Sequence, residues 1–185
     1  MLDRMAAERL MWSRVRDVPD WPEPGVLFRD LSPLMADPIT FGTAVDLMAV
    51  ALGRGRLDVV IGVEARGFPY AAALAYHLGA GFVTLRKPGK LPGDVHHEAY
   101  DLEYGSAALE IHQDAVGVGS RVVIVDDVLA TGGTACAAIE LVRRTGAEVV
   151  GLAVIMDLPS LGGNARVREQ GMAITALLNG DAPVH

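Results

Sequence analysis

Residues 122–134 read VVIVDDVLATGGT, and this stretch decides the fold class of the chain. Four β-branched residues, Val122 to Val125, predict a buried strand. Two acidic residues, Asp126 and Asp127, follow at once, and a turn rich in Thr and Gly comes next, from Ala130 to Thr134. A strand that leads through such a turn into a helix is the repeating unit of α/β proteins, which bind ligands at the carboxyl ends of their strands.

The turn has the chemistry of a phosphate site. A helix predicted to begin at Gly133 offers free N–H groups and the positive end of its dipole, and the hydroxyls of Thr131 and Thr134 add donors. Asp126 and Asp127 can accept hydrogen bonds from sugar hydroxyls, so the spacing predicts a site for a phosphorylated ribose. The turn matches neither GxGxxG nor GxxxxGK[ST], which disfavours dinucleotide-binding and Walker-type proteins. A purely structural strand–turn–helix corner is the alternative.

Strands and helices alternate around this stretch. Apolar, β-rich runs predict strands at 58–63, 81–85, 121–125 and 148–156, and a last apolar segment follows at 174–178. Helical spacing predicts helices at 3–17, 37–53, 68–78 and 133–144, with an irregular, proline-rich segment at 19–25. Continuous apolar strands joined by helices indicate a mostly parallel central sheet with flanking helices, the α/β class.

Residues 86–105 interrupt the alternation. They have no periodic pattern and contain Pro88, Gly89, Pro92, Gly93 and Gly105, so we predict a long loop. A loop of this length within a compact domain is usually functional or disordered.

Length and charge narrow the class of protein further. The 185 residues suit a single domain, and 51% hydrophobic residues can build a sizeable core. A net charge of −7 gives no electrostatic footprint for a nucleic acid, so any phosphate recognition must be local. No export signal or membrane span is visible, and a single cysteine, Cys136, is compatible with a reducing cytosol. We therefore expect a cytoplasmic protein with no nucleic-acid and no membrane partner.

The stretch at 122–134 resembles the phosphoribosyl pyrophosphate (PRPP) signature of type I phosphoribosyltransferases. Three more stretches resemble the branch of that family that acts on adenine: PEPGVLFRDLSPL (22–34), GVEARGFPYAAALAYHLGAGFVTLRKPGKLP (62–92) and YDLEYGSAALEIHQDAV (100–116). The resemblance covers roughly residues 20–160. It implies one phosphoribosyltransferase domain over 1–185, with a small hood from about 20–34 and 157–185 and a flexible catalytic loop at about 86–105.

The resemblance implies a PRPP site in three parts. Asp126 and Asp127 would hold the ribose diol, and Ala130, Thr131, Gly132, Gly133 and Thr134 would hold the 5′-phosphate. The pyrophosphate would meet Glu64, Ala65 and Arg66 at the end of a strand, together with Arg86, Lys87 and Lys90. Cations placed there can neutralise a leaving group that carries several negative charges.

The resemblance also implies an adenine site. Leu27, Phe28 and Arg29 match the hood, and Leu158 matches its other wall, so that Phe28 and Leu158 would sandwich the purine. Residues 162–166 and the tail from Arg168 match the family poorly, and we predict no role for them.

Three residues are implied in catalysis: Glu103, Tyr104 and Arg66. Relatives that use hypoxanthine or guanine carry an Asp where this chain has Ala130, so the resemblance points to Glu103 as the acceptor of the purine proton. A loop that closes over the site would exclude water from the reacting centre.

The resemblance thus implies purine salvage, in which the phosphoribosyl group of PRPP is transferred to adenine to give AMP and pyrophosphate. It also implies Mg²⁺ as cofactor, bound mainly through PRPP and through water to Asp126 and Asp127, and a homodimer with partly shared sites. One alternative is the same transfer to xanthine, guanine or orotate. The other is a non-catalytic regulator that binds PRPP and nucleic acid, which would need an added module or a basic face.

Overall fold

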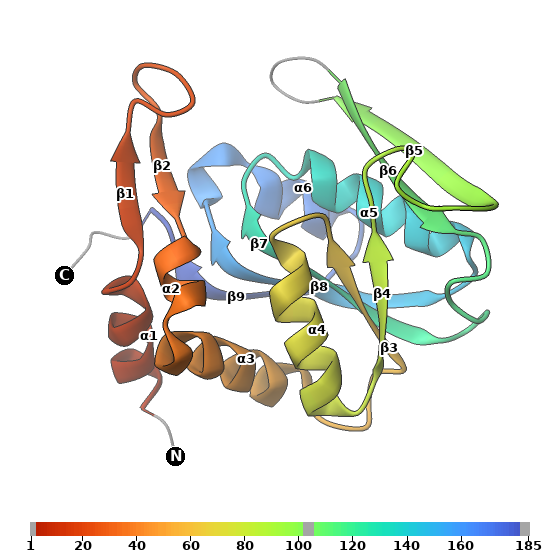
Figure 1. Ribbon diagram of the computed structural model, residues 1–185, viewed down its shortest axis with the longest axis horizontal. Helices are drawn as coiled ribbons and strands as arrows, with labels where there is room; N and C mark the ends of the chain where they lie inside the picture. Colours follow the sequence, from red (N-terminus) through yellow and green to blue (C-terminus); the bar gives the residue numbers. More distant parts are fainter. Residues whose placement is uncertain (1–2, 102–105, 182–185) are drawn as a thin grey trace.

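A five-stranded parallel sheet forms the centre of the computed structural model, which describes residues 3–101 and 106–181 (Figure 1). The strands lie in the order β4-β3-β7-β8-β9, and every neighbouring pair is parallel. Their bounds are β3 (Val59–Val63), β4 (Gly81–Leu85), β7 (Arg121–Leu129), β8 (Glu148–Asp157) and β9 (Ile174–Asn179). The predicted α/β class and parallel sheet are confirmed.

Helices cover both faces of the sheet because its strands are apolar on both sides. On β7, Val123 and Val125 join a core with α3 (Pro38–Leu52) and α4 (Gly67–Leu78). Val122 and Ile124 point the other way and pack against α5 (Gly133–Arg144). The short helix α6 (Gly163–Glu169) lies next to α5. No helix among residues 3–101 and 106–181 is long and apolar enough to cross a membrane.

A separate antiparallel hairpin stands near the N-terminus, and it corrects the predicted helix over 3–17. Helix α1 (Arg4–Trp12) ends early, and β1 (Arg16–Pro19) then pairs with β2 (Leu27–Asp30). Residues from Arg16 onward form a strand and not the end of a helix, because Arg16 pairs with Asp30 and Asp17 pairs with Arg29 across the two strands. We call this unit the β1–β2 hairpin. A short helix, α2 (Ser32–Ala36), links it to α3.

A second antiparallel pair corrects the predicted loop at 86–105. Residues 86–94 have no helix or strand, but β5 (Val95–Asp101) pairs along its whole length with β6 (Ser106–His112). This β5–β6 ribbon packs on α5, where Arg144 donates to the carbonyl of His97 at 2.9 Å and pairs with Glu98. Leu109 and Ile111 of β6 are buried. Contacts with α5 therefore support a strand that its mixed sequence does not reveal.

Candidate active site

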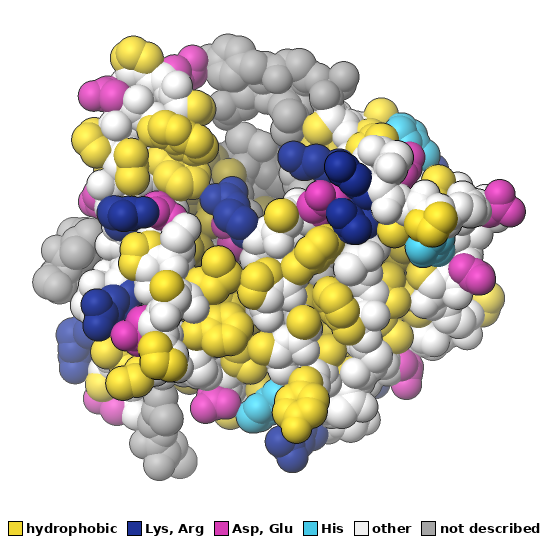
Figure 2. Space-filling view, in the orientation of Figure 1, with side chains coloured by type: hydrophobic (Ala, Val, Ile, Leu, Met, Phe, Trp, Pro, Cys, Tyr) yellow, Lys and Arg dark blue, Asp and Glu magenta, His cyan; other side chains and the backbone are white. Residues whose placement is uncertain are grey.

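A cavity of about 500 Å³ opens at the carboxyl ends of β3, β7 and β8, between the β1–β2 hairpin and the β5–β6 ribbon. Figure 2 shows Lys and Arg side chains on both sides of a hollow in this region. The predicted residues that line the cavity are Leu27, Phe28, Arg29, Glu64, Ala65, Arg66, Lys87, Asp126, Asp127, Ala130, Thr131, Gly132, Gly133, Thr134 and Leu158. Arg86 and Lys90 are outside the described lining, and Glu103 and Tyr104 lie outside the described residues.

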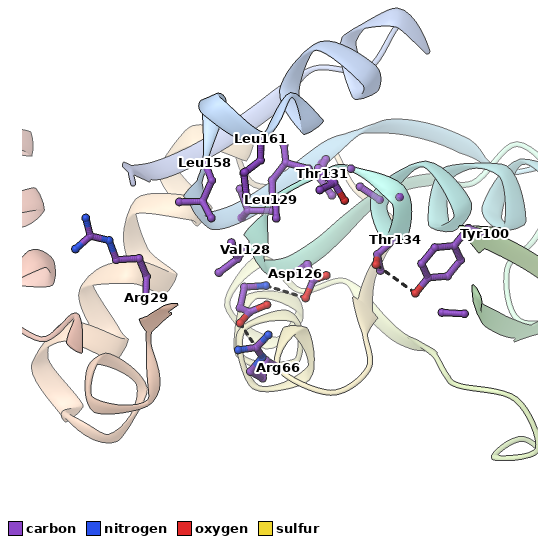
Figure 3. A pocket seen from close by; sticks show the side chains of 18 of the residues that line it. Arg29, Arg66, Tyr100, Asp126, Val128, Leu129, Thr131, Thr134, Leu158 and Leu161 are labelled. Carbon is purple, nitrogen blue, oxygen red and sulfur yellow. Dashed lines mark hydrogen bonds and ion pairs between the residues drawn. The ribbon is translucent and has the colours of Figure 1, made fainter. Parts of the chain in front are cut away.

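The acidic pair is placed at the end of β7 (Figure 3). Asp126 Oδ1 accepts a hydrogen bond of 2.9 Å from the N–H of Asp127, while the Asp127 side chain is buried. Burial raises the pKa of Asp126 well above its ordinary value, and the charge of Asp127 adds to the rise. Two carboxylates this close disfavour carrying two full charges, so a ligand that brings hydrogen-bond donors or a cation would stabilise the charged pair.

Arg66 bridges the acidic pair and the β1–β2 hairpin. Its Nε lies 3.0 Å from Asp127 Oδ2, and its guanidinium carbon lies 5.5 Å from the centroid of the Phe28 ring. The ion pair does not have hydrogen-bond geometry, so this buried oxygen of Asp127 has no hydrogen-bond partner within the described part of the chain. Arg66 thus stands inside the cavity with a carboxylate as its partner (Figure 3).

A close approach of backbones holds Arg66 in place. Gly67 follows it at the start of α4, and a Cβ atom there would lie 2.5 Å from the carbonyl oxygen of Val125 on β7. Because only glycine lacks that atom, the turn after β3 can rest directly against the end of β7. The arrangement brings the residues of two neighbouring strands into one site.

Glu64 organises the basic segment after β4. Its Oε2 atom accepts hydrogen bonds from Arg86 Nε at 3.0 Å and from the N–H of Lys87 at 2.7 Å. Arg86 is the main cause that holds the pKa of Glu64 below its ordinary value. Arg86 is therefore engaged in fixing the segment, while the exposed Lys87 side chain is the cation that lines the cavity.

The phosphate loop, Ala130 to Thr134, leads from β7 into α5 as predicted. The first N–H groups of α5 have no acceptor within the helix, and they lie in the lining of the cavity with Gly133 and Thr134. The hydroxyl of Thr134 donates to the Tyr100 hydroxyl of the ribbon at 3.2 Å, as Figure 3 shows. The loop has the donors and the dipole orientation of an anion site.

The β1–β2 hairpin forms the opposite wall. The Phe28 ring packs against the Trp21 ring in a tilted arrangement, with centroids 4.3 Å apart and an interplanar angle of 59°. Arg29 is engaged elsewhere: it pairs with Asp17, and its guanidinium lies over the Trp12 ring at 5.6 Å. The Arg29 guanidinium is therefore engaged by the hairpin and by α1. Leu158, which follows β8, lines the cavity on the side of the sheet.

Ten lining residues were not among the predicted site residues: Val26, Tyr100, Ala107, Leu109, Val128, Leu129, Ala135, Leu152, Val154 and Leu161. Tyr100 has a signal in the sequence, because it opens the quoted stretch YDLEYGS that precedes β6. Leu161 gives none, since it lies just beyond residues 20–160, which the resemblance covers. Apolar side chains such as Leu129 and Leu161 suit the flat faces of an aromatic ligand.

Comparison with protein families matches residues 48–168 to the phosphoribosyl transferase domain. This range holds the β3–α4 turn, the acidic pair and the phosphate loop. Fold, site and match agree, and the chain belongs to the phosphoribosyltransferase family.

Individual relatives narrow the membership to the adenine phosphoribosyltransferases. The chain is 52% identical over 180 residues to the adenine phosphoribosyltransferase of Streptomyces coelicolor, which covers 96% of this chain and 99% of that protein. It is 55% identical over 155 residues to the one from Thermobifida fusca, over 84% and 88% of the two chains. These relatives do not favour the xanthine, guanine, orotate or regulator alternatives.

Solved structures show the same fold. The crystal structure of adenine phosphoribosyltransferase from Thermoanaerobacter pseudethanolicus matches with a TM-score of 0.87 at 43% identity, over 93% of this chain and 99% of that one. The Saccharomyces cerevisiae enzyme, complexed with an imino-altritol bisphosphate and adenine, matches with a TM-score of 0.87 at 35% identity, over 94% and 99%.

Proposed function

We propose that this cavity performs the reaction of its family on adenine: the chain transfers the phosphoribosyl group of PRPP to adenine, giving AMP and pyrophosphate in purine salvage. The observation that carries the proposal is the juxtaposition of the acidic pair, the phosphate loop and Arg66 around one cavity. Sugar hydroxyls, a terminal phosphate and a leaving pyrophosphate need carboxylates, N–H donors and cations respectively.

The residues would divide the work along the length of PRPP. The phosphate loop holds the 5′-phosphate, and Asp126 and Asp127 accept hydrogen bonds from the ribose diol. Arg66 and Lys87 neutralise the pyrophosphate as the bond from ribose C1 to its oxygen breaks. Adenine N9 then forms the new bond to C1 from the opposite face, while positive charge on the ribose is shielded from water.

The β1–β2 hairpin would choose the base. Within the described part of the chain β2 pairs only with β1, and in an antiparallel pair the N–H and C=O groups of every second residue point away from the partner strand. Part of the backbone at Leu27 to Arg29 therefore keeps free donors and acceptors at the other edge. The N–H and C=O groups of Val26, by contrast, are bonded within the turn, to Glu23 and Trp21. Fixed backbone donors and acceptors can tell adenine from a 6-oxo purine, whose N1 and 6-position have the reversed hydrogen-bonding pattern.

Mg²⁺ suits the donor set of this site. Mg²⁺ is commonly held by one or two carboxylates together with substrate phosphates, and the buried Asp127 Oδ2 atom has no hydrogen-bond partner among the described residues. Asp126 and Asp127 would hold the ion through water, and when bound it would supply positive charge to the pyrophosphate.

Three further features stay predictions from the sequence. They are the proton transfer by Glu103 with Tyr104 beside it, the homodimer, and the cytoplasmic location. Sedimentation of the purified protein at two concentrations measures the oligomeric state directly.

A base panel tests the proposed function. Purified protein with PRPP and Mg²⁺ is assayed for kcat/KM with adenine, hypoxanthine and guanine. We expect AMP from adenine and a preference of roughly 10⁴-fold over the 6-oxo purines, because the mismatched edge would leave buried polar groups unpaired. Hypoxanthine or guanine within tenfold of adenine would contradict the assignment of the β1–β2 hairpin to adenine.

A further inference from the structure

The phosphate loop is held from behind by helix α6. The carbonyl oxygen of Ala130 accepts a hydrogen bond of 3.0 Å from the N–H of Gly163, and that of Thr131 accepts one of 2.9 Å from Arg166 Nη1. The next carbonyl, of Gly132, accepts from Cys136 within the start of α5 at 2.9 Å. Three consecutive carbonyl groups of the loop are therefore fixed.

The direction of these carbonyl groups decides the direction of the N–H groups. Gly163 and Arg166 are outside the lining of the cavity as the described residues define it, whereas the loop itself lines it. In a planar trans peptide, the C=O and the following N–H point to opposite sides. The carbonyl groups of Ala130 and Thr131, bound on the α6 side, therefore aim the N–H groups of Thr131 and Gly132 away from the atoms of α6 that bind them.

Helix α6 makes this contact only because its first residue has no side chain. A Cβ atom on Gly163 would lie 2.2 Å from the carbonyl oxygen of Ala130 and 2.7 Å from the backbone nitrogen of Gly132. Both are backbone atoms, which cannot move aside without moving the loop. Helix α6 thus contacts the phosphate loop twice, through the backbone of Gly163 and through the side chain of Arg166.

Arg166 also brings a positive charge to the back of the loop. Burial raises the pKa of the Cys136 thiol in the first turn of α5, and the charge of Arg166 acts against that rise. The same charge favours an anion bound at the start of α5.

We propose that Arg166 is a positioning residue of the 5′-phosphate site. Its guanidinium fixes the Thr131 carbonyl, and through it the N–H donors that meet the phosphate, without touching the substrate. The inference rests on the proposed function, since it takes the loop to be the 5′-phosphate site of PRPP.

The test separates the two ends of PRPP. Calorimetry measures binding of ribose 5-phosphate, and of pyrophosphate with Mg²⁺, to the wild type and to Arg166→Ala. We expect ribose 5-phosphate to bind about five- to tenfold more weakly to the variant, because one charged hydrogen bond is lost at an exposed position. The variant's affinity for pyrophosphate and its KM for adenine should stay within twofold of the wild-type values. Its KM for PRPP should rise by about the same factor as its affinity for ribose 5-phosphate falls.

Arg168 provides the matched control. It is on the same helix with the same charge, but its Nε donates to Asn164 Oδ1 at 2.6 Å, within α6. Arg168→Ala should bind ribose 5-phosphate within twofold of the wild type. Arg166→Lys keeps the charge and one donor, and should recover part of the affinity.

The outcomes are distinguishable. A folded Arg166→Ala variant that binds ribose 5-phosphate as the wild type does, or that loses pyrophosphate affinity equally, would overturn the inference. A wild type that binds no ribose 5-phosphate would instead contradict the proposed function. Gly163→Ala should weaken ribose 5-phosphate binding more than Arg166→Ala does. If Gly163→Ala fails to fold, the Arg166→Ala and Arg166→Lys variants, which change an exposed side chain, decide the question alone.

Discussion

The two walls of the cavity are built in different ways. The acidic pair and the phosphate loop come from one continuous run, at the end of a strand that is flanked on both sides by β3 and β8. The β1–β2 hairpin has two strands, and its Leu27 and Trp21 side chains are 50% and 51% exposed, whereas Asp127 is 4% exposed. A central strand of a covered sheet opens only at high free energy, while a small hairpin opens more easily. Under the proposed function, the ribose phosphate would meet the rigid wall and the base would meet the adaptable one.

The largest expected effect is on the rigid wall. Asp126→Asn combined with Asp127→Asn should lower kcat/KM for PRPP by at least about 100-fold, because charged hydrogen bonds to the diol are worth about 1.5–3 kcal/mol each. Asp58→Asn is the matched control, since Asp58 accepts from the N–H of Arg121 at the opposite ends of β3 and β7. Steady-state kinetics measure this loss of kcat/KM, on variants whose circular dichroism spectra match that of the wild type. A double variant with near-wild-type kcat/KM would remove the acidic pair from the site.

An intermediate effect is expected on the adaptable wall. Phe28→Ala removes the ring that lies between Trp21 and Arg66, and should raise the KM for adenine about tenfold through lost stacking. The KM for PRPP should change less. The ratio of the two fold-changes measures how independently the two walls bind their parts of the substrates. Phe28→Leu keeps an apolar side chain, so its KM for adenine should lie between the values for the wild type and for Phe28→Ala. Equal changes in both constants would mean that the walls act as one unit.

The smallest effect concerns the stability of the hairpin. Hydrogen bonding, first from the Ser32 side chain and also from Arg16, lowers the pKa of Asp30 from 3.8 to about 2. A carboxyl whose pKa is lower in the folded state stabilises the fold above its unfolded pKa, and this contribution is lost as the pH falls from about 4 to about 2.

Asp30→Asn should therefore lower the free energy of unfolding by about 1 kcal/mol at pH 7, less than the pKa change alone implies because solvent screens the pair. The difference from the wild type should shrink as the pH approaches 3. Urea unfolding at several pH values measures it, with the exposed Asp46→Asn as control. A difference independent of pH would show that the charge of Asp30 does not stabilise the hairpin.

The same contrast explains what the sequence could predict. The strands and helices from β3 to β8 that build the sheet have strong periodicity and clear ends, and the prediction of α5 over 133–144 matches the structure residue for residue. The contiguous run at 126–134 placed the acidic pair and the phosphate loop correctly at the end of β7. Local sequence is sufficient to predict these elements because strands buried on both faces, and the helices that cover them, have strong hydrophobic patterns.

The missed elements depend on partners far along the chain. β1 is short and charged, and its pairing with β2 is fixed by ion pairs that span a proline-rich turn. β5 reads VHHEAYD, which has no clean alternation, and packing on α5 supports it. The role of Arg29 illustrates the same limit, because only the fold reveals that Asp17 and Trp12 engage its guanidinium.

The ion pair between Arg66 and Asp127 has a consequence for how tightly substrate can bind. Each group is a candidate partner for a different part of PRPP, yet the two also form an ion pair with each other, with Arg66 Nε and Asp127 Oδ2 3.0 Å apart. Under the proposed function, substrate entry would be an exchange of partners, in which the diol displaces the guanidinium and the pyrophosphate receives it. The affinity for PRPP would accordingly be a difference between two sets of contacts, because the ion pair competes with the contacts that each group makes to substrate.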